Sequence, residues 1–405
     1  MNICVLGQGY VGLPISIHAA QAGFTVYGYD IDKEKLKELK EGITTSPDVK
    51  KKTILDLQKS KKLNFISELS KYLEISIFVI AVPTPLHVNY EPDLSMLKNA
   101  CEKIGAVIAS NSLVINESTS FIGTLRDFIK PIIEKESEST GIKYAVAPER
   151  IDPGNIKWNV SNTPRVISGL SDEAIKEAEE FYEKFCSDIY SVSSPEIAEA
   201  AKLIENSFRQ VNIALVNQLT NVAQKYNFSM NDAVNAAATK PFGFIPFYPS
   251  IGVGGHCIPV DPNYLIYSAK KVGSDASLIE QANEINLNMP EIITTRIEKI
   301  FGDTLLEKQI QIVGISYKLD ISDIRESPAL ELIKILRSRG AVVTWCDPIV
   351  NECWGETSTP LKKDIDLGLI VTAHSCIDLS IWKTYGVKAI DLSANSNSYG
   401  WPKFL

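Results

Sequence analysis

The feature that most constrains the fold of this chain is a series of short apolar runs, separated by helix-like segments, between Met1 and about Tyr190. The runs are apolar throughout instead of alternating between apolar and polar residues, which is typical of strands covered on both faces in a parallel sheet. Alternating strands and helices with short turns indicate a doubly wound α/β domain. The predicted strands are residues 2–7, 25–30, 75–82, 112–118, 143–148 and 165–169.

A long helix is predicted after this region, because the strand signal almost disappears between Ser193 and about Ala238. Residues 193–228 read as one continuous helix that starts with a capping Ser194 and has a proline in its first turn. A helix of roughly 30 residues is about 45 Å long. Such a rod can form the spine between two domains and also a contact between subunits.

The rest of the chain predicts a loop, a further helical run and a second α/β unit. The loop is expected at 241–262, where proline, glycine and aromatic residues are frequent, and the helical run at 275–301. The second unit is expected to contain a helix at 327–340 and strands at 308–317, 341–347, 366–372 and 387–393. Residues 395–405 are expected to be loosely held. The predicted fold class is therefore α/β, with two Rossmann-like doubly wound domains joined by a long central helix and a helical middle domain.

Length, charge and cysteine content exclude several classes of protein. A chain of 405 residues is too long for one ordinary core, so two or three domains are expected. The net charge of −8 disfavours a nucleic acid partner. The seven cysteines include no CxxC pair, and their odd number predicts a reducing compartment without a disulfide framework. No segment approaches the roughly 20 apolar residues that cross a bilayer, and the chain opens on a strand without a secretory signal. We therefore expect a cytoplasmic protein without a membrane partner, and we predict no metal site.

A glycine-rich turn follows the first predicted strand. Gly7, Gly9 and Gly12 form a G-x-G-x-x-G pattern with Tyr10 and Val11 between the last two glycines. In such a turn the first glycine allows the bend, the second lets a pyrophosphate approach the backbone, and the third lets helix and strand pack closely. Alone the pattern is weak, and it could be a structural turn.

An acidic residue strengthens the prediction of a dinucleotide site. Asp30 ends the second strand, at the spacing after Gly12 where a carboxylate can bind a ribose 2′-hydroxyl. A 2′-phosphate would be repelled there, so NAD is favoured over NADP as the cofactor. Lys33 is near enough in sequence to contact the adenosine.

Polar turns follow other predicted strands of the same sheet. Pro83 and Thr84 form one of them, residues 117–119 (Glu-Ser-Thr) a second, and Glu149 with Arg150 a third. Ligands of open α/β sheets bind outside the carboxyl ends of the strands, so these turns are expected to surround a nicotinamide. Glu149 at that edge could act as a general base, and the alternative is a helix cap or a solvated acid.

The long helix carries Lys202, Asn206 and Arg209 at positions i, i+4 and i+7, which share one face. A lysine and an amide one turn apart could donate to a developing oxyanion. The alternative is a polar stripe exposed to solvent.

The predicted loop ends in GVGGHCIPVDP (252–262), which places Cys257 among three glycines and two prolines. A thiolate is a strong nucleophile and can hold an acyl group as a thioester. Isolated cysteines are more often small buried hydrophobic residues, but the rigid setting favours a nucleophile here. Asp261 follows four residues later.

In the second α/β unit, Lys318 and Arg325 lie in a charged loop between a strand and a helix. Such a loop is the usual shape of a phosphate or nucleotide site. The alternative is a salt-bridged loop.

Taken together, these residues resemble the UDP-glucose/GDP-mannose dehydrogenase family through nearly the whole chain. The matching stretches, in family order, are 7–14 (GQGYVGLP), 82–85 (VPTP), 117–119 (EST), 147–155 (APERIDPGN), 202–215 (KLIENSFRQVNIAL), 252–262 (GVGGHCIPVDP) and 317–332 (YKLDISDIRESPALEL). The resemblance implies oxidation of the C6 hydroxymethyl of a nucleotide sugar to a carboxylate with two NAD per sugar.

The resemblance also implies roles for single residues. Cys257 attacks the C6 aldehyde to give a thiohemiacetal, which loses a second hydride to become a thioester. Glu149 and Asp261 match acids that handle water, Lys202 and Asn206 match an oxyanion-stabilising pair, and Thr119 matches a site threonine.

The expected cofactor-binding residues are Gly7, Gly9, Tyr10, Val11, Gly12, Asp30, Lys33, Pro83, Thr84 and Thr119. The expected substrate-binding residues are Glu149, Arg150, Lys202, Asn206, Arg209, Tyr248, Lys318, Arg325 and the backbone of Gly254 and Gly255.

The GGHCIPVDP stretch resembles the branch that acts on UDP-N-acetylhexosamines, UDP-GlcNAc or UDP-ManNAc, because Val260 stands where the glucose branch has a lysine. The chain departs from the N-acetylhexosamine branch at Asn263 and Gln218. A UDP-glucose 6-dehydrogenase and a catalytically dead NAD- or nucleotide-sugar-binding regulatory protein are the alternatives. The expected domains are 1–192 for NAD, 193–300 for a central helical and dimerisation domain with the cysteine loop, and 301–405 for UDP. A homodimer through the central helix is expected.

Overall fold

A computed structural model describes residues 1–405 except 45, 47–48, 151–154, 156, 256 and 395–400. The described chain divides into two compact units. The N-terminal unit comprises Met1–Glu205 and Asn263–Ser274, and the C-terminal unit comprises Asn206–Pro262 and Asp275–Leu405. The residues of the predicted APERIDPGN stretch that fall at 151–154 lie outside the described residues.

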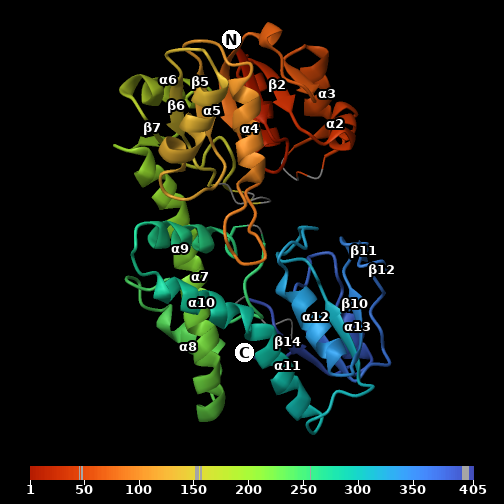
Figure 1. The fold of residues 1–405 in the computed structure, drawn as a ribbon. Coiled ribbons are helices and arrows are strands. Elements are labelled where there is room, and N and C mark those ends of the chain that lie inside the picture. Colours follow the sequence, from red (N-terminus) through yellow and green to blue (C-terminus); the bar gives the residue numbers. More distant parts are fainter. Residues whose placement is uncertain (45, 47–48, 151–154, 156, 256, 395–400) are drawn as a thin grey trace. The chain divides into compact units, whose positions relative to one another are not determined.

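Within the described residues, the N-terminal unit contains an eight-stranded sheet in the order β3-β2-β1-β4-β5-β6-β7-β8 (Figure 1). All neighbouring strands are parallel except β6 and β7, which are antiparallel. The strands are β1 (Asn2–Leu6), β2 (Thr25–Tyr29), β3 (Leu63–Ile66), β4 (Ile75–Ile80), β5 (Leu113–Asn116), β6 (Lys143–Val146), β7 (Arg165–Gly169) and β8 (Ile189–Ser191). The helices are α1 (Gly12–Gln21), α2 (Lys33–Lys40), α3 (Lys51–Lys59), η1 (Lys71–Leu73), α4 (Ser95–Gly105), the π-helical turn η2 (Leu125–Ile129), α5 (Lys130–Glu136) and α6 (Asp172–Tyr182).

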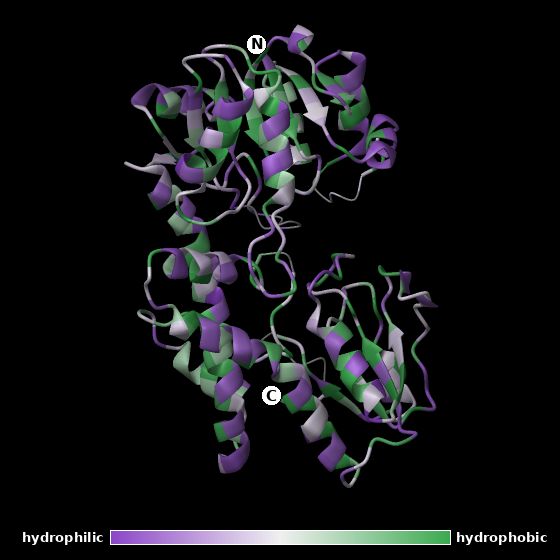
Figure 2. Cartoon of the chain, in the orientation of Figure 1, coloured by the Kyte–Doolittle hydropathy of each residue, from purple (hydrophilic) through white to green (hydrophobic). Residues whose placement is uncertain are grey.

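The central strands of this sheet supply side chains to a hydrophobic core on each face. In β1, Ile3 and Val5 belong to one buried cluster, whereas Cys4 and Leu6 belong to another. Because successive side chains of a strand point to opposite faces, both faces of the sheet are covered. This explains why the strands read as continuous apolar runs and appear hydrophobic in Figure 2.

The C-terminal unit contains, among its described residues, a four-stranded parallel sheet in the order β10-β9-β13-β14. Its strands are β9 (Gln309–Val313), β10 (Val342–Cys346), β13 (Leu367–Ile370) and β14 (Ala389–Asp391), and β11 (Glu352–Cys353) pairs with β12 (Glu356–Thr357). Its helices are α8 (Met230–Ala237), α10 (Ser277–Leu287), α11 (Met289–Ile300), α12 (Pro328–Ser338) and α13 (Ser380–Thr384). The division between the units falls inside two further helices, α7 (Pro195–Tyr226) and α9 (Asp261–Lys271).

The predicted α/β fold class, the predicted strands and the long helix are confirmed. Four strands were missed: β3 has four residues, β8 has three, two of them exposed, and β11 and β12 have two residues each. The helical run at 275–301 consists of two helices that separate at Asn288, just before Pro290, which fits only the first turn of α11.

The prediction that the C-terminal tail is loosely held is wrong for its last five residues. Asp391 at the end of β14 donates its N–H to Pro402 O at 3.0 Å, and its carboxylate lies 3.0 Å from Lys403 Nζ. The Trp401 ring packs edge-on against Trp382 with centroids 6.3 Å apart, and Leu405 is buried. Polarity suggested a solvated end, but apolar anchors and an ion pair attach it to the sheet.

Candidate active site

The glycine turn after β1 gives each glycine a different role. Gly7 has φ +91°, and a Cβ there would lie 2.4 Å from Ala81 O. A Cβ on Gly12 would lie 1.8 Å from Gly7 O, so Gly12 must be small for α1 to approach the strand. A Cβ on Gly9 would meet no described atom within 4 Å, and Gly9 is exposed. Gly9 is therefore the glycine that leaves room for a ligand, as a pyrophosphate-binding turn requires.

Asp30 follows β2 beside this turn and is almost fully buried. Its carboxylate accepts the Gln8 N–H at 2.9 Å and the Asp32 N–H at 3.0 Å, and it pairs with Lys35 Nζ at 3.0 Å. A carboxylate has roughly four acceptor positions, and described residues use three of them, which leaves capacity for a ribose hydroxyl. Lys35 is the lysine that pairs with this acid. Lys33, predicted to contact the adenosine, begins α2 and is exposed.

The structure brings two of the predicted polar turns together. Thr84 Oγ1 donates to Thr119 O at 2.7 Å, and Ser118 Oγ donates to Val82 O at 2.8 Å. Tyr264 of α9 adds a hydrogen bond to Thr84 O at 3.2 Å. Pro83 is exposed and Thr119 is half-buried beside these contacts. The two turns therefore form one edge of the sheet, as the parallel arrangement predicted.

Glu117 was predicted to belong to the ligand-facing turn but lies beneath it. Its carboxylate is buried, pairs with Arg165 Nη1 at 2.5 Å and accepts a hydrogen bond from the Tyr182 hydroxyl. Burial raises the pKa of Tyr182 well above its ordinary value, and the Glu117 charge raises it further. The phenol therefore stays protonated and donates a hydrogen bond to Glu117. Glu117 therefore supports the turn that carries Thr119.

Glu149 and Lys202 form a buried pair, with Glu149 Oε2 at 3.8 Å from Lys202 Nζ. This arrangement contradicts the alternative of a solvated loop acid. Arg150, predicted to contact substrate, forms a bidentate ion pair with Glu205 and donates to Pro164 O at 2.9 Å. Arg150 therefore attaches the turn after β6 to α7, and pairing with an acid on a distant helix is not visible in sequence.

In the C-terminal unit, Asn206 donates its side-chain N–H to the Asp261 carboxylate, and Arg209 donates to the Asn206 carbonyl oxygen. Asn206 and Asp261 are buried, whereas Arg209 is exposed. The alternative of a solvent-exposed stripe is therefore wrong for Lys202 and Asn206 and correct for Arg209.

Cys257 lies in a turn whose backbone is held on both sides. Gly255 has φ +88°, and a Cβ there would lie 2.6 Å from the Tyr317 ring. The Gly255 N–H, predicted to hold a sugar, donates to Arg325 O at 3.1 Å. The Cys257 carbonyl accepts the N–H groups of Val260 at 3.1 Å and Asp261 at 2.8 Å, so the turn that carries Cys257 leads into α9, which begins at Asp261. The cysteine turn therefore packs on the loop that carries Lys318 and Arg325.

Cys257 also differs from the other cysteines in exposure. It is half-buried, whereas Cys4, Cys101, Cys186, Cys346 and Cys353 are buried and Cys376 is exposed. Burial raises the pKa of Cys101 to about 12 and that of Cys346 to about 11, so these thiols stay protonated and unreactive.

The other predicted substrate residues are dispersed. Arg325 pairs with Asp323, Nη2 to Oδ2 at 2.6 Å, which supports the salt-bridged alternative for this residue, and Lys318 is half-buried in the same loop. The Tyr248 hydroxyl donates a hydrogen bond to Asn235 of α8 at 2.9 Å.

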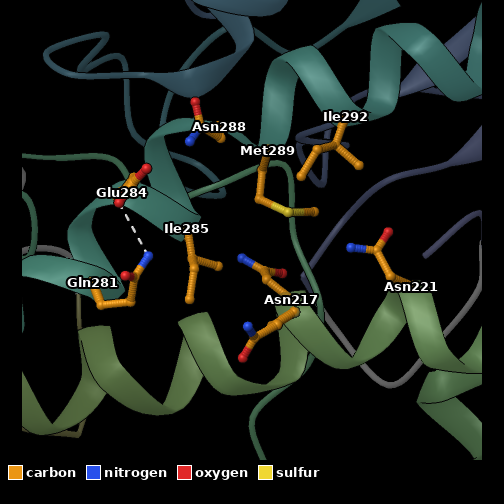
Figure 3. A pocket seen from close by; sticks show the side chains of 9 residues that line it. Asn217, Asn221, Gln281, Glu284, Ile285, Asn288, Met289 and Ile292 are labelled. Atoms are coloured by element: carbon orange, nitrogen blue, oxygen red, sulfur yellow. Dashed lines mark hydrogen bonds between the residues drawn. The ribbon is translucent and has the colours of Figure 1, made fainter. Parts of the chain in front are cut away.

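A cavity of about 170 Å³ lies between α7, α10 and α11 (Figure 3). It is lined by Gln218, Asn217, Asn221, Gln281, Glu284, Ile285, Asn288, Met289 and Ile292. None of these lining residues was predicted to contact substrate.

Glu199 is a site-supporting residue that the sequence analysis missed. It lies on α7 one turn before Lys202 and is buried. Its carboxylate accepts the N–H groups of Gly123 at 2.6 Å and Leu125 at 2.9 Å, just after the Thr119 turn. Burial raises the pKa of Glu199 to about 7, although these two hydrogen bonds lower it. The partner N–H groups belong to a segment far from α7 in sequence, so no local signal marks this contact.

Among the described residues, no group of histidine, cysteine and acidic side chains could hold a metal ion. No described helix is both long and apolar enough to span a membrane.

The glycine geometry predicts opposite phenotypes for two similar substitutions. Gly12→Ala should destabilise the N-terminal unit by at least about 1–3 kcal/mol, because its Cβ overlaps backbone. Gly9→Ala should keep the wild-type melting temperature but weaken NAD binding about tenfold or more, because its methyl group fills the open space. Thermal melting and NAD titration of both variants test this, and wild-type NAD affinity in Gly9→Ala would contradict it.

The raised pKa of Glu199 predicts that the free energy of unfolding depends on pH. Because the native state holds this proton up to about pH 7 and the unfolded state only to about 4.5, stability falls as pH rises between these values. The loss from this group is roughly 3 kcal/mol at about 1.36 kcal/mol per pKa unit. Urea unfolding at pH 5 and pH 8 should show a smaller difference for Glu199→Gln than for wild type. Glu196→Gln, which removes a charge one turn away, is the control and should keep most of the difference.

Comparisons with known proteins place these two units in one family. The NAD binding domain of the UDP-glucose/GDP-mannose dehydrogenase family matches residues 1–186, its central domain 196–288 and its UDP binding domain 311–389. The chain is 34% identical to a UDP-N-acetyl-D-mannosamine dehydrogenase of Pyrococcus horikoshii, over 95% of this chain and 92% of that one. It is 32% identical to a UDP-N-acetyl-D-glucosamine 6-dehydrogenase of Salmonella typhi, over 87% and 83% of the two chains.

A solved structure of the UDP-N-acetylmannosamine dehydrogenase of Pyrococcus horikoshii matches with a TM-score of 0.88 and 32% identity. The match covers 99% of this chain and 97% of that one. Because all three family domains match in order and both relatives align over most of their length, the chain belongs to the UDP-glucose/GDP-mannose dehydrogenase family and is an NAD-dependent sugar-nucleotide dehydrogenase.

Proposed function

We propose that the chain oxidises C6 of a UDP-N-acetylhexosamine to a carboxylate in two NAD-dependent steps through a thioester on Cys257. The observation that carries this proposal is the set of buried polar contacts made by successive turns of α7. Lys202 pairs with Glu149, and one turn later Asn206 binds Asp261, which follows Cys257 at the start of α9. Buried groups of this kind, on a helix bonded to the segment that carries a half-exposed thiol, suit acyl chemistry better than a binding function alone.

The residues that would hold NAD are those of the glycine turn and Asp30. Gly9 leaves the space that a pyrophosphate needs, and Asp30 retains acceptor capacity for a ribose. Bound NAD supplies a hydride acceptor for each of the two oxidations. The joined turns at Thr84 and Thr119 lie at the carboxyl edge of the sheet, where a nicotinamide is expected.

Cys257 acts after the first oxidation has produced a C6 aldehyde. Its thiolate adds to the carbonyl carbon and the oxygen takes up a proton, which gives a thiohemiacetal. Loss of a hydride and a proton from this adduct gives a thioester, and water then cleaves the C–S bond to release the carboxylate and the thiol. A bound thiohemiacetal prevents the aldehyde from escaping between the two oxidations.

The neighbouring polar groups have roles that follow from their charge. The Lys202 ammonium and the Asn206 amide donate hydrogen bonds, so they stabilise the oxyanion that forms at C6. Glu149 and Asp261 are acids that can accept a proton from water or from the substrate hydroxyl. Lys318 and Arg325 would bind the diphosphate, and for Arg325 this requires exchange of its Asp323 partner.

The relatives named above act on UDP-N-acetylglucosamine or UDP-N-acetylmannosamine, and Val260 in place of a lysine favours the same class here. The test is the number of NADH formed per sugar consumed, with UDP-GlcNAc, UDP-ManNAc and UDP-glucose offered separately. Two NADH from an N-acetyl sugar supports the proposal. If two NADH form from UDP-glucose only, the substrate is UDP-glucose and not an N-acetylhexosamine. Binding of the sugar nucleotides without turnover would indicate a regulatory protein.

Cys257→Ser provides the test of the covalent step. We expect acid formation to fall by at least about 10³-fold, because a hydroxyl is a far weaker nucleophile than a thiolate at neutral pH. Cys376→Ser is the matched control, because that thiol is exposed and lies in the segment Asp275–Leu405, apart from the cysteine turn in sequence. This variant should keep wild-type activity. Production of acid by Cys257→Ser at the native rate would refute the thioester.

We infer further that the chain forms a homodimer through α7. Large apolar side chains are exposed along one face of this helix. They are Ile197, Ile204, Phe208, Leu215, Val222 and Tyr226. At about 100° per residue, this face lies opposite the buried polar face that holds Lys202 and Asn206. An exposed apolar stripe of this length is typical of a protein interface, and a second copy of α7 offers a matching surface with two-fold symmetry.

Leu215→Glu places a charge in the middle of this stripe without disturbing the interior of the chain. Light scattering should therefore show that the Leu215→Glu variant is a monomer. Its thermal melting curve, followed by secondary structure, should match that of the wild type. Tyr72→Glu alters an equally apolar and more exposed residue in the N-terminal unit and should leave the dimer intact. A dimer in the Leu215→Glu variant would contradict the role of α7.

The division into an NAD-binding domain (1–192), a central helical domain (193–300) and a UDP-binding domain (301–405) is part of this proposal. The cytoplasmic location stays a prediction.

A further inference from the structure

A buried polar cluster lies at the carboxyl edge of the four-stranded sheet in the C-terminal unit. His374, Asp347 and Ser316 form it, and each is 1% exposed or less. Ser316 follows β9, Asp347 follows β10 and His374 follows β13, so the cluster connects the loops after three neighbouring strands. Ligands of open α/β sheets bind at this edge, and the loop after β9 carries Lys318.

The hydrogen bonds of His374 define the tautomer of its ring. Nδ1 accepts the backbone N–H of Asp320 at 2.9 Å, so Nδ1 carries no proton. The Asp320 carboxylate is farther away, with Oδ1 at 3.8 Å. Nε2 therefore carries the ring proton, and it faces Asp347 Oδ2 at 3.2 Å and Ser316 Oγ at 3.1 Å. The imidazole thus bridges the end of the β9 loop to the acid after β10.

Ser316 and Asp320 transmit this contact to Lys318. Ser316 Oγ donates to Lys318 O at 3.0 Å, and Thr372 Oγ1 donates to Ser316 O at 2.9 Å. Asp320 adopts a left-handed backbone with φ +58°, a conformation that few residues adopt without support. The Lys318 backbone is therefore held from Ser316 on one side and from the His374-bound Asp320 on the other.

Asp347 occupies the place in this sheet that Asp30 occupies in the other, at the end of the strand beside the first. Asp347, however, accepts the backbone N–H groups of Ile315, Ser316, Ile349 and Val350 in addition to facing His374. Burial raises the pKa of Asp347, but the hydrogen bonds from His374 and the backbone outweigh it and hold the pKa below its ordinary value. All acceptor positions of Asp347 are thus used, so it is an anchor and not a ribose-binding acid.

We propose that His374, Asp347 and Ser316 are positioning residues for the nucleotide of the substrate: they hold the loop between Gly314 and Asp320 in the shape in which Lys318 meets the diphosphate. The proposal rests on the proposed function only in that a UDP-sugar binds this unit. In this unit the acid after the second strand, Asp347, is fully hydrogen-bonded within the protein and cannot bind a ribose as Asp30 can. This explains how a second Rossmann-like sheet can bind a mononucleotide instead of NAD.

The test measures binding of UDP alone by calorimetry, which needs neither NAD nor catalysis. His374→Leu replaces the imidazole with an apolar side chain of similar volume and removes the hydrogen bonds of both ring nitrogens, and it should raise the Kd for UDP and the KM for the UDP-sugar about tenfold or more. The kcat at saturating sugar and the Kd for NAD should stay within about twofold of wild type. His374→Gln, which can still donate or accept, should recover part of the affinity, and His87→Leu, at an exposed histidine, should change nothing.

An unchanged Kd for UDP in a folded His374→Leu protein overturns the proposal, and so does a loss of kcat with unchanged UDP binding. If His374→Leu does not fold, Ser316→Ala decides, because it removes only the hydroxyl between His374 and the Lys318 carbonyl and should weaken UDP binding about threefold. Failure of the wild type to bind UDP would instead refute the proposed function. Binding of UDP without sugar oxidation would refute the proposed activity and leave this test intact.

Discussion

The site depends on a helix, α7, that buries a row of polar side chains and exposes a row of large apolar ones. The buried polar side chains are those of Glu199, Lys202, Asn206, Gln210, Asn217 and Thr220, and six exposed positions carry large apolar side chains. A buried polar group is costly unless it is hydrogen-bonded. Each of these side chains finds a partner within its own unit, from the Gly123 and Leu125 amides to Glu149, Asp261, Asn283, Asn286 and Arg296. The contacts that stabilise α7 therefore also orient the groups proposed to act on C6.

Close packing against glycine backbone is the second constraint in this molecule. At Gly7 and Gly12 it brings the first strand, its neighbour and the first helix together, and at Gly254 and Gly255 it packs the cysteine turn against Tyr317. A side chain at any of these four positions would overlap other atoms by several tenths of an ångström or more. Gly9 is the exception in the first turn, because the space beside it is open. These glycines thus fix the backbone after β1 and beside Cys257, and Gly9 leaves open space in the first turn.

The two sheets illustrate how one topology serves two ligands. In both, an acid ends the strand next to the first strand and accepts a backbone N–H from the first loop. Asp30 keeps acceptor capacity, whereas Asp347 is saturated by the protein and by His374. The same position therefore keeps acceptor capacity in one unit and is a structural anchor in the other, and the difference arises from the number of donors that surround it.

The sequence by itself determined most strands of the two sheets, the extent of α7, the glycine turn and the unusual setting of Cys257. These features depend on local properties: continuous apolar runs, helix starts, and glycines and prolines whose backbone preferences act within a few residues. It also gathered Thr84 and Thr119 at one edge, because parallel strands all end on the same side. Only the tertiary structure decided that Glu117 lies beneath the Thr119 turn, that Arg150 binds Glu205, that Lys35 pairs with Asp30, and that Trp401 and Leu405 anchor the tail. It alone revealed Glu199 and His374. Whether a charged or polar side chain faces ligand or protein depends on partners far away in sequence, and the pattern of one segment carries no information about those partners.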